Sequence, residues 1–169
     1  MRPPTAPTAL VLTVSDGVTA GTRTDESGLH LAARLMEEGF TVERALVPDD
    51  VTAISTAVRD GARVHQLVVT TGGTGLTPRD VTPQALEGLI DYSIPGMGEL
   101  MRATGLRSTP NAALSRSLAG VIGGTLVIAV PGSPKGALES LEALLPVLAH
   151  ALETLADDSS RHASTPASR

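Results

Sequence analysis

The sequence contains no cysteine and almost no aromatic residues, and each absence excludes a class of function. Without cysteine the chain cannot form disulfides, thiolate metal sites or cysteine nucleophiles. Phe, Tyr and Trp together make up 1% of the chain, represented by Phe40 and Tyr92. A flat ring or nucleobase would therefore find few aromatic side chains on which to stack.

Positive charge is also scarce, since 13 Lys and Arg residues stand against 18 Asp and Glu residues, a formal net charge of -5. Nucleic-acid-binding proteins usually carry a basic face, so we expect no nucleic-acid partner. No apolar run approaches the roughly 18 residues of a membrane-spanning helix, and residues 1–8 lack the apolar core of a signal peptide. We therefore expect no membrane association and a cytoplasmic location.

The length of 169 residues fits one domain with one apolar core. Hydrophobic residues make up 41% of the chain, and they are mainly Leu, Val, Ile and Ala. We expect a disordered N-terminus over residues 1–8, a single domain over 9–156 and a disordered tail over 157–169. The tail is rich in Ser, Ala and charged residues, which rarely bury enough apolar surface to fold.

Short, β-branched apolar runs alternate with helical patterns along the chain. The runs span residues 9–14, 41–47, 66–70 and 125–130, and they predict strands buried on both faces of a parallel sheet. The alternation of strand and helix predicts a three-layer, doubly wound, mostly parallel α/β sheet. The segment around 110–124 is interrupted by glycine, and antiparallel edge strands are one interpretation of it.

Helices are predicted where apolar residues repeat at helical spacing and where start signals occur. Thr82-Pro83 and Ser133-Pro134 each combine a capping residue with a proline at the first helical position. Asp49 or Asp50 is expected to cap another helix, and a short helix is expected around residues 97–104. The predicted buried faces carry Leu29, Ala32 and Met36; Val51, Ile54 and Val58; Leu86, Leu89 and Ile90; and Leu138, Leu141, Leu145, Leu148, Leu152 and Leu155.

The loops that follow the predicted strands are the expected ligand site, because ligands of open α/β sheets bind beyond the carboxyl ends of the strands. The clearest signal is Thr70-Thr71-Gly72-Gly73-Thr74-Gly75. Its glycines allow unusual φ values and bring several N–H groups close to an oxygen-rich ligand, while Thr71 and Thr74 add hydroxyl donors. We expect a phosphate-bearing anion over residues 70–80. The spacing matches neither the dinucleotide fingerprint nor a Walker loop, and a plain strand-to-helix turn is the alternative.

Charged residues stand near these loops. Lys135, the only lysine, falls in the first turn of a predicted helix, where a cation is unfavourable unless an anion binds nearby; a solvated lysine is the alternative. Asp16, Asp49, Asp50 and Asp80 occupy loops or helix starts, where each one alone is best explained as a cap. Two of them beside a phosphate could share a Mg²⁺ ion. The four histidines show no metal-ligand spacing.

Five ordered blocks resemble the MoaB/Mog family of molybdenum cofactor biosynthesis, and the likeness spans about residues 9–155. The blocks are Thr70 to Gly75, Arg79-Asp80-Val81-Thr82-Pro83, Pro95-Gly96-Met97-Gly98-Glu99, Ser115-Arg116 and Pro131-Gly132-Ser133-Pro134-Lys135. The resemblance implies a molybdopterin-binding fold and a homotrimer. It also implies transfer of AMP from Mg-ATP to the terminal phosphate of molybdopterin, which gives adenylyl-molybdopterin and pyrophosphate. A molybdenum-insertion protein is an implied partner.

The resemblance further assigns roles to residues of this chain. It implies that Asp49 and Asp80 are catalytic and hold Mg²⁺, with a share for Asp50 left open. The substrate-binding residues that it implies are Ser15, Asp16, Thr71, Gly72, Gly73, Thr74, Gly75, Arg79, Glu99, Ser115, Pro131, Gly132, Ser133 and Lys135.

Two other interpretations stay open from sequence. One is a paralogue that binds molybdopterin without catalysis. The other is a phospho-acceptor receiver domain, which has an acceptor Asp after its third strand; Thr70 and Thr71 stand there instead, so this interpretation has little support. The sequence also leaves open whether the downstream metal is molybdenum or tungsten.

Overall fold

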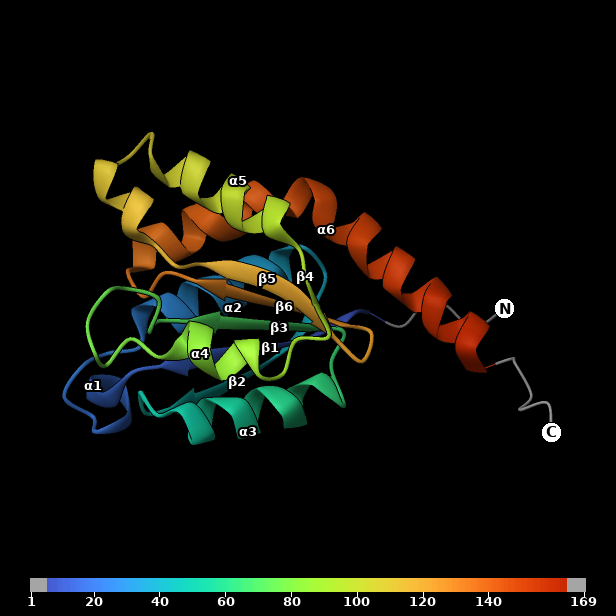
Figure 1. Ribbon diagram of the computed structural model, residues 1–169, viewed down its shortest axis with the longest axis horizontal. Helices are drawn as coiled ribbons and strands as arrows, with labels where there is room; N and C mark the ends of the chain where they lie inside the picture. The colour runs from blue at the N-terminus through green and yellow to red at the C-terminus, as the bar shows by residue number, and fades with distance from the viewer. Residues whose placement is uncertain (1–5, 164–169) are drawn as a thin grey trace.

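The computed structural model describes the backbone of residues 6–163 and the side chains of residues 6–157. In this part of the chain, one six-stranded sheet lies between two layers of helices (Figure 1). Its strands are β1 (Thr8–Val14), β2 (Thr41–Val47), β3 (Leu67–Thr71), β4 (Tyr92–Ser93), β5 (Leu118–Ile122) and β6 (Thr125–Val130). Its helices are α1 (Asp16–Thr19), α2 (Glu26–Glu37), α3 (Val51–Ala62), α4 (Thr82–Glu87), α5 (Pro95–Gly105) and α6 (Pro134–Ala163), with a 3-10 segment η1 (Pro110–Leu114).

The strand order is β2-β1-β3-β6-β5-β4. The first four strands are parallel, whereas β5 is antiparallel to β6 and β4 is antiparallel to β5. The chain passes from β1 to β2 on one side and then to β3 on the other side of β1, so the winding reverses between β1 and β3. The predicted doubly wound, mostly parallel α/β sheet is confirmed, as are antiparallel strands near residues 110–124; strand β4 was not predicted.

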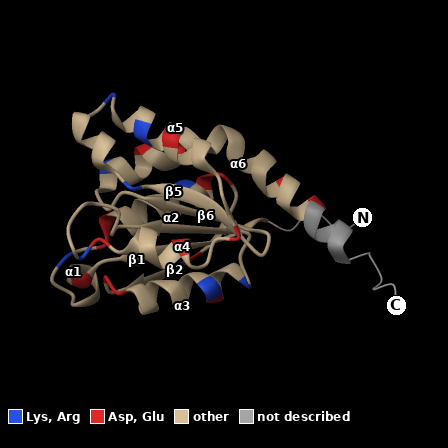
Figure 2. Ribbon diagram, viewed as in Figure 1, with Lys and Arg blue, Asp and Glu red and all other residues tan. Residues whose placement is uncertain are grey.

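The core lies on both faces of the sheet, because successive side chains of a strand point to opposite faces. On one face, Val11 and Ile128 pack with buried residues of α2, α5 and α6. On the other face, Leu12 and Val127 pack with buried residues of α3 and α4. Figure 2 shows that the charged residues lie mainly on helices and loops, and the sequences of β1, β3 and β6 contain none. The central strands can therefore be covered by helices on both sides.

Strand β2 forms where it was predicted, but it is not buried on both faces. It lies at the edge of the sheet, and its residues are exposed or half-buried, with Leu46 47% exposed. Its sequence already contains Glu43 and Arg44, charges that a central strand of this sheet lacks. An edge position explains them, since charged residues on an edge strand oppose pairing with other chains.

Helix α2 also forms as predicted, but with a different buried face. Leu31, Ala32 and Leu35 are buried, whereas Leu29 is 47% exposed and Met36 is 53% exposed. Both sets of residues have helical spacing, so periodicity alone did not distinguish them. Packing against the sheet and α6 selects the face that carries Leu31 and Leu35.

Two predicted helix caps are confirmed and one is wrong. Asp50 caps α3 by accepting from the Ala53 amide at 2.8 Å, and Ser133 accepts from the Gly136 amide at 3.2 Å at the start of α6. Thr82 does not cap α4, because it is the first helical residue and follows the N-cap Val81. The Thr82 side chain is buried instead, and its hydroxyl donates to the Gly72 carbonyl at 2.8 Å.

Described secondary structure extends beyond the expected domain bounds of residues 9 and 156 at both ends. Thr8 already pairs with Thr41 in the sheet, and the Pro7 carbonyl accepts from the Thr41 amide at 2.9 Å. Helix α6 continues to Ala163, because residues 157–163 contain no Gly or Pro that would end it. Thr8 and residues 157–163 therefore belong to a described strand and helix, and residues 1–5 and 164–169 lie outside the described part. No described helix combines the length and apolarity needed to cross a membrane.

The contrast between a central and an edge strand predicts unequal effects of the same truncation. Leu12 of β1 is 0% exposed and Leu46 of β2 is 47% exposed. We expect Leu12→Ala to lower the free energy of unfolding by about 2–5 kcal/mol through lost burial and a cavity. Leu46→Ala should lower it by about 1 kcal/mol or less. Urea unfolding followed by circular dichroism measures both, and equal losses would contradict the edge position of β2.

Candidate functional site

The loops that follow β1, β2, β3 and β6 meet at the carboxyl edge of the sheet, beside α1 in Figure 1. The loops after β1 and β2 are joined through Asp16 and Asp49. The loops after β3 and β6 are joined by the Thr71 hydroxyl, which donates to the Pro131 carbonyl at 2.8 Å. This edge includes the reversal point between β1 and β3, where open α/β sheets hold their ligands.

Gly72 and Gly73 form the tightest part of this edge. Their φ values are +103° and +66°, a region that residues with a side chain rarely adopt. A Cβ atom at position 72 would lie 2.3 Å from the Val14 carbonyl oxygen, and one at position 73 would lie 2.3 Å from the Thr82 hydroxyl. Both backbone conformation and space therefore require glycine at these two positions.

The glycine loop offers fewer free donors than the sequence suggested. The Gly72 amide donates to the Val130 carbonyl at 3.3 Å, and the Gly75 amide donates to the Asp80 carboxylate. The Thr71 hydroxyl donates to Pro131 and is not free for a ligand, which corrects its predicted role as a donor. Within the described residues, the amides of Gly73 and Thr74 have no hydrogen-bond partner. These two amides are the loop's main-chain donors for an anion.

Two clefts meet at this loop. One, here called the apolar cleft, has a volume of about 610 Å³, and the other, the polar cleft, has about 640 Å³. Gly73, Asp80, Gly132 and Ser133 line both clefts and form the junction between them. The junction also includes the start of α6, whose N-terminal dipole favours an anion.

The apolar cleft lies between the glycine loop, α5, η1 and the first turns of α6. Its wall combines the apolar residues Leu76, Met101, Ala112 and Leu114 with a few polar ones. Arg102 donates to the Ser117 carbonyl at 2.7 Å, and the hydroxyls of Ser115 and Ser117 are 2.8 Å apart. An apolar slot with a few fixed polar groups suits a flat heterocycle.

The polar cleft lies between β1, the start of α2 and the loop after β2. It is lined by Thr13, Ser15, Thr24, Ser27 and Asp49, among others. Asp25, the N-cap of α2, fixes this wall. It accepts from the Thr13 hydroxyl at 2.9 Å, the Gly28 amide at 3.0 Å and the Arg44 guanidinium at 2.6 Å. The sequence analysis did not identify this buried network.

Asp80 stands at the junction with its carboxylate held by the preceding turn. Its Oδ2 accepts from the Thr77 amide at 2.8 Å and from the Thr77 hydroxyl at 2.6 Å. Partial burial acts to raise the pKa of Asp80, but hydrogen bonds from Thr77 and Gly75 and the charge of Arg116 outweigh it, so the pKa lies below its ordinary value of 3.8. Asp80 is therefore a carboxylate at neutral pH.

Arg116 supports the glycine loop from behind, and sequence reasoning assigned it no role. Its Nε donates to the Gly75 carbonyl at 2.8 Å and its Nη2 to the Asp80 carbonyl at 2.6 Å, while its amide donates to the Thr74 carbonyl at 2.9 Å. The three bonds hold the loop's carbonyls away from the clefts. Its place directly after Ser115, inside one of the quoted blocks, was the signal available in the sequence.

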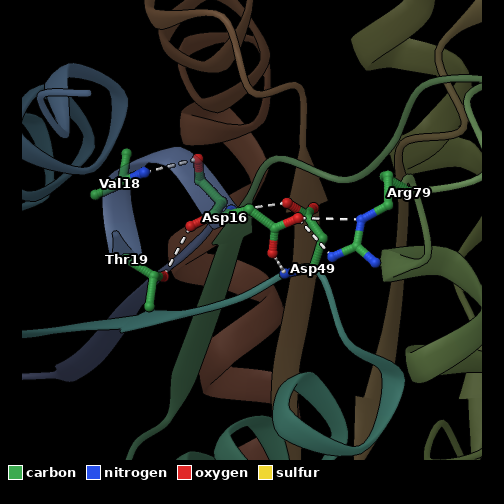
Figure 3. Close-up of polar contacts among 6 residues, drawn as sticks. Asp16, Val18, Thr19, Asp49 and Arg79 are labelled. Atoms are coloured by element: carbon green, nitrogen blue, oxygen red, sulfur yellow. Dashed lines mark hydrogen bonds and ion pairs between the residues drawn. The ribbon is translucent and has the colours of Figure 1, made fainter. Parts of the chain in front are cut away.

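Asp16 and Arg79 lie beside the clefts rather than in their walls. The two side chains form an ion pair, and each aspartate of the Asp16 and Asp49 pair accepts from the other's amide (Figure 3). The hydrogen bond from the Asp49 amide and then the Arg79 guanidinium lower the pKa of Asp16. Asp16 is therefore ionised at neutral pH.

The structure brings most of the predicted site residues together. Those that line at least one cleft are Ser15, Asp49, Thr71, Gly72, Gly73, Thr74, Gly75, Asp80, Ser115, Pro131, Gly132 and Ser133. Glu99 is exposed on α5 and lines neither cleft, so its predicted contact with substrate has no geometric support. Lys135 also lines neither cleft; its side chain is 75% exposed and lies 3.6 Å from Glu139.

The described residues contain no group of three or more His, Cys, Asp or Glu side chains arranged to hold a metal ion. Asp49 and Asp80 do line the same polar cleft. Two carboxylates that line one cleft fit Mg²⁺ bound together with phosphate oxygens and water, which is how the ion is usually held with nucleotides. They do not form a metal site of protein ligands alone.

An α/β domain of this topology, with two clefts joined at a glycine loop and a helix start, has the features expected of a domain that binds a phosphate-bearing ligand. The family model described as "Probable molybdopterin binding domain" matches residues 10–150. The chain belongs to this molybdopterin-binding domain family.

Individual relatives agree with this assignment. The molybdopterin adenylyltransferase of Helicobacter pylori is 37% identical over 150 residues, which cover 86% of this chain and 85% of the relative. The structure of the molybdopterin biosynthesis enzyme MoaB from Thermus thermophilus is 51% identical with a TM-score of 0.80, and the match covers 88% of this chain and 95% of that one.

Other relatives are longer than this chain. Gephyrin of Dictyostelium discoideum is 38% identical over 154 residues, which cover 84% of this chain but 21% of gephyrin. The molybdenum cofactor biosynthesis bifunctional proteins of Chlorobaculum tepidum and Synechococcus elongatus are matched over 49% and 47% of their length. The chain therefore spans a fifth to a half of these longer proteins.

The contacts of Gly72 predict a strong dependence on glycine at this position. Gly72→Ala would combine a strained φ with a Cβ 2.3 Å from a backbone oxygen, whereas Gly21→Ala has a φ of +72° but open space. We expect Gly21→Ala to cost about 1–2 kcal/mol of unfolding free energy from backbone strain alone. Gly72→Ala should cost at least about 3 kcal/mol, because the loop must also move. If urea unfolding gave similar losses for the two variants, the close approach of Gly72 to the Val14 carbonyl of β1 would be contradicted.

The hydrogen bonds of Asp80 predict its titration. We expect its carboxyl carbon, followed by NMR, to titrate below pH 3.8. Because the folded pKa is lowered, the stabilisation from this group is present above the unfolded pKa and is lost as the pH falls through the folded pKa. Thr77→Val should raise the midpoint, and Thr77→Ser should leave it low. A wild-type midpoint above the ordinary value would contradict the described hydrogen bonds.

Proposed function

We propose that this chain transfers AMP from ATP to the terminal phosphate of molybdopterin, releasing pyrophosphate. The observation that carries the proposal is the junction of Gly73, Asp80, Gly132 and Ser133, which borders an apolar and a polar cleft at once. A reaction that joins two phosphate-bearing molecules needs two adjacent sites with a shared region for the reacting groups. A protein that only binds molybdopterin would not require a second, polar cleft that borders the first.

The chemical character of the two clefts supports an assignment of substrates. The pterin is a flat heterocycle with a few polar edges, and we assign it to the apolar cleft beside Met101, Leu114 and Ser115. The nucleotide carries a triphosphate and a ribose, and we assign it to the polar cleft beside Ser15, Ser27 and Asp49. The phosphates of both then point toward the junction.

The reaction forms one bond and breaks one. An oxygen of the molybdopterin phosphate attacks the α-phosphorus of ATP, and the bond from that phosphorus to the bridging oxygen of the β-phosphate breaks. The bond electrons leave with pyrophosphate. Such transfers depend mainly on positioning and on neutralisation of charge, and they require no covalent intermediate with the protein. The absence of cysteine nucleophiles is therefore compatible with this reaction.

Charge neutralisation matters here because two anions must approach each other on an acidic protein. The free amides of Gly73 and Thr74 and the start of α6 supply positive partial charge at the junction. Asp49 and Asp80 fit as ligands of Mg²⁺ bound with ATP, and this ion would neutralise phosphate charge when bound. Asp50 is the N-cap of α3 and lines neither cleft, whereas Asp49 lines the polar cleft, which favours Asp49 over Asp50 in this role.

The comparisons support the same activity, since relatives named molybdopterin adenylyltransferase cover most of the chain. A trimer, a molybdenum-insertion partner and a cytoplasmic location remain proposals drawn from the resemblance. Apolar side chains such as Leu100, Leu106 and Val147 are exposed on α5, at its end and on α6, and a subunit contact would cover such residues. Light scattering after gel filtration would give the mass of the assembly, and a monomer would contradict the trimer.

The two carboxylates predict a separation of binding from turnover. We expect Asp80→Asn and Asp49→Asn each to lower kcat of adenylyl transfer by about 100-fold or more, because a group facing the reacting phosphates is lost. Molybdopterin binding, followed by fluorescence quenching, should change little, since the pterin ring is assigned to the wall of Met101, Leu114 and Ser115, which neither variant changes. Mass spectrometry of the products formed from molybdopterin and Mg-ATP measures the turnover.

Asp60→Asn is the matched control. Asp60 lies on α3 away from both clefts, with its side chain 62% exposed and paired with Arg63. This variant should turn over like wild type. Unchanged kcat in both Asp49→Asn and Asp80→Asn would remove the proposed mechanism, and a wild-type protein that binds molybdopterin but forms no adenylyl-molybdopterin would identify the binding-only paralogue.

A further inference from the structure

Asp16 and Asp49 occupy matching positions after two paired strands. Val14 and Val47 are register partners at the ends of β1 and β2, and the Ser15 amide donates to the Val47 carbonyl at 3.0 Å. Each aspartate stands two residues beyond its strand. Parallel strands that end in register deliver matching positions to the same place. The two acidic side chains therefore meet because of the sheet register.

The two aspartates bind each other through backbone amides. The Asp16 amide donates to Asp49 Oδ2 at 2.9 Å, and the Asp49 amide donates to Asp16 Oδ1 at 3.0 Å (Figure 3). This reciprocal pair fixes both carboxylates in orientation. Asp49 Oδ1 has no hydrogen-bond partner among the described residues and stays available to a ligand of the polar cleft.

Arg79 occupies the remaining oxygen of Asp16. Its Nε donates to Asp16 Oδ2 at 3.0 Å, and its Nη2 contacts the same oxygen. Both oxygens of Asp16 are thus used within the protein, one toward Asp49 and one toward Arg79. Asp16 is therefore placed to connect the loop after β2 with the turn that carries Arg79.

The turn that carries Arg79 also carries Asp80. The Asp80 amide donates to the Thr77 carbonyl at 3.0 Å, and the Asp80 carboxylate accepts from the Thr77 amide and hydroxyl. A turn closed by these three bonds has little freedom of its own. A contact that anchors Arg79 therefore also sets the position of its neighbour Asp80.

The charges of this cluster explain why an arginine is needed. Asp16 pairs with the Arg79 guanidinium, and this contact, followed by the charges of Asp49 and Asp50, raises the pKa of Arg79. The side chains of Arg79 and Asp16 are 66% and 48% exposed, so the ion pair adds little to global stability. The effect of the ion pair is local. The Arg79 charge offsets the repulsion between the carboxylates of Asp16 and Asp49, which lie close together on separate loops.

We propose that Asp16 and Arg79 are positioning residues, which hold the Asp49 carboxylate at a fixed spacing from the Asp80 carboxylate in the lining of the polar cleft. The proposal rests on the proposed function for its effect on turnover. Its structural part stands on the contacts alone: Asp49 to Asp16, Asp16 to Arg79, and Arg79 to Asp80 through the chain. Neither Asp16 nor Arg79 needs to touch a substrate.

The first test uses the free protein and no substrate. We expect Arg79→Gln to speed hydrogen exchange of the Asp49 amide, measured by NMR, by about fivefold or more, because the acceptor Asp16 loses its second anchor. The melting temperature should change by about 2 °C or less, as for an exposed ion pair. The matched control is Arg63→Gln at the C-cap of α3, where Arg63 is 71% exposed and its Nη1 lies 3.3 Å from Asp60 Oδ1. This control should leave the exchange rate unchanged.

The second test measures turnover. We expect Asp16→Asn and Arg79→Gln each to lower kcat by about 10-fold to 100-fold, because misplacement of a reacting group by about 1 Å has costs of this size. The KM for ATP and the affinity for molybdopterin should change by about twofold or less. The double variant should be no slower than the slower single variant, because both changes break one connection. Arg79→Lys should recover part of kcat, since it keeps the charge without the planar fork.

The outcomes separate this inference from the proposed function. A wild-type protein without adenylyl transfer would overturn the function, while the exchange result still decides whether the connection exists. The inference would be overturned if the wild-type protein is active and Arg79→Gln has the same kcat and the same hydrogen-exchange rate of the Asp49 amide. A raised KM for ATP with normal kcat would also overturn it, because Arg79 would then bind the nucleotide directly.

Discussion

The close approach of the Gly72-Gly73 backbone to the end of β1 and to the start of α4 is the contact on which the site depends. A Cβ atom at either position would lie 2.3 Å from an oxygen of these neighbours. Because no side chain stands between them, the loop after β3 can also pack against Gly132, where an added Cβ would lie 3.1 Å from Gly72 Cα. The apolar and polar clefts share this packed backbone as a common border. The tight packing thus creates one junction where two separate ligands can meet.

Three arginines near this site donate to other groups of the protein. Arg116 donates to carbonyls of the glycine loop, Arg102 donates to the Ser117 carbonyl, and Arg79 pairs with Asp16. Their role in the structure is to hold main-chain and carboxylate oxygens in place. Backbone amides and the start of α6 supply positive potential at the junction, and Arg23 lines the polar cleft beside it. An acidic chain can therefore bind a phosphate-bearing ligand at this point. The amides attract the phosphate through their partial positive charge, and they do not form ion pairs with the nearby carboxylates.

The sequence was informative where one physical requirement dominated. Uncharged, β-branched runs such as 9–14 and 125–130 predicted central strands, and the Gly-Gly pair after a strand indicated φ values that residues with a side chain rarely adopt. It was uninformative where the answer depended on neighbours distant in the chain. Leu29 and Leu31 of α2 both fit helical spacing, and only packing against α6 decided which was buried. Likewise, the Thr71 hydroxyl is used by Pro131, sixty positions away, and Arg116 acts on a loop about forty positions earlier. Such pairings arise from the fold and leave no local pattern.

A crystal structure with adenylyl-molybdopterin bound tests the central claim most directly. The account predicts the pterin in the apolar cleft, the adenosine in the polar cleft, and the linking phosphates within hydrogen-bond distance of the Gly73 and Thr74 amides, with Asp80 facing them. A product molecule bound in a single cleft, or with its phosphates turned away from these two amides, would contradict it.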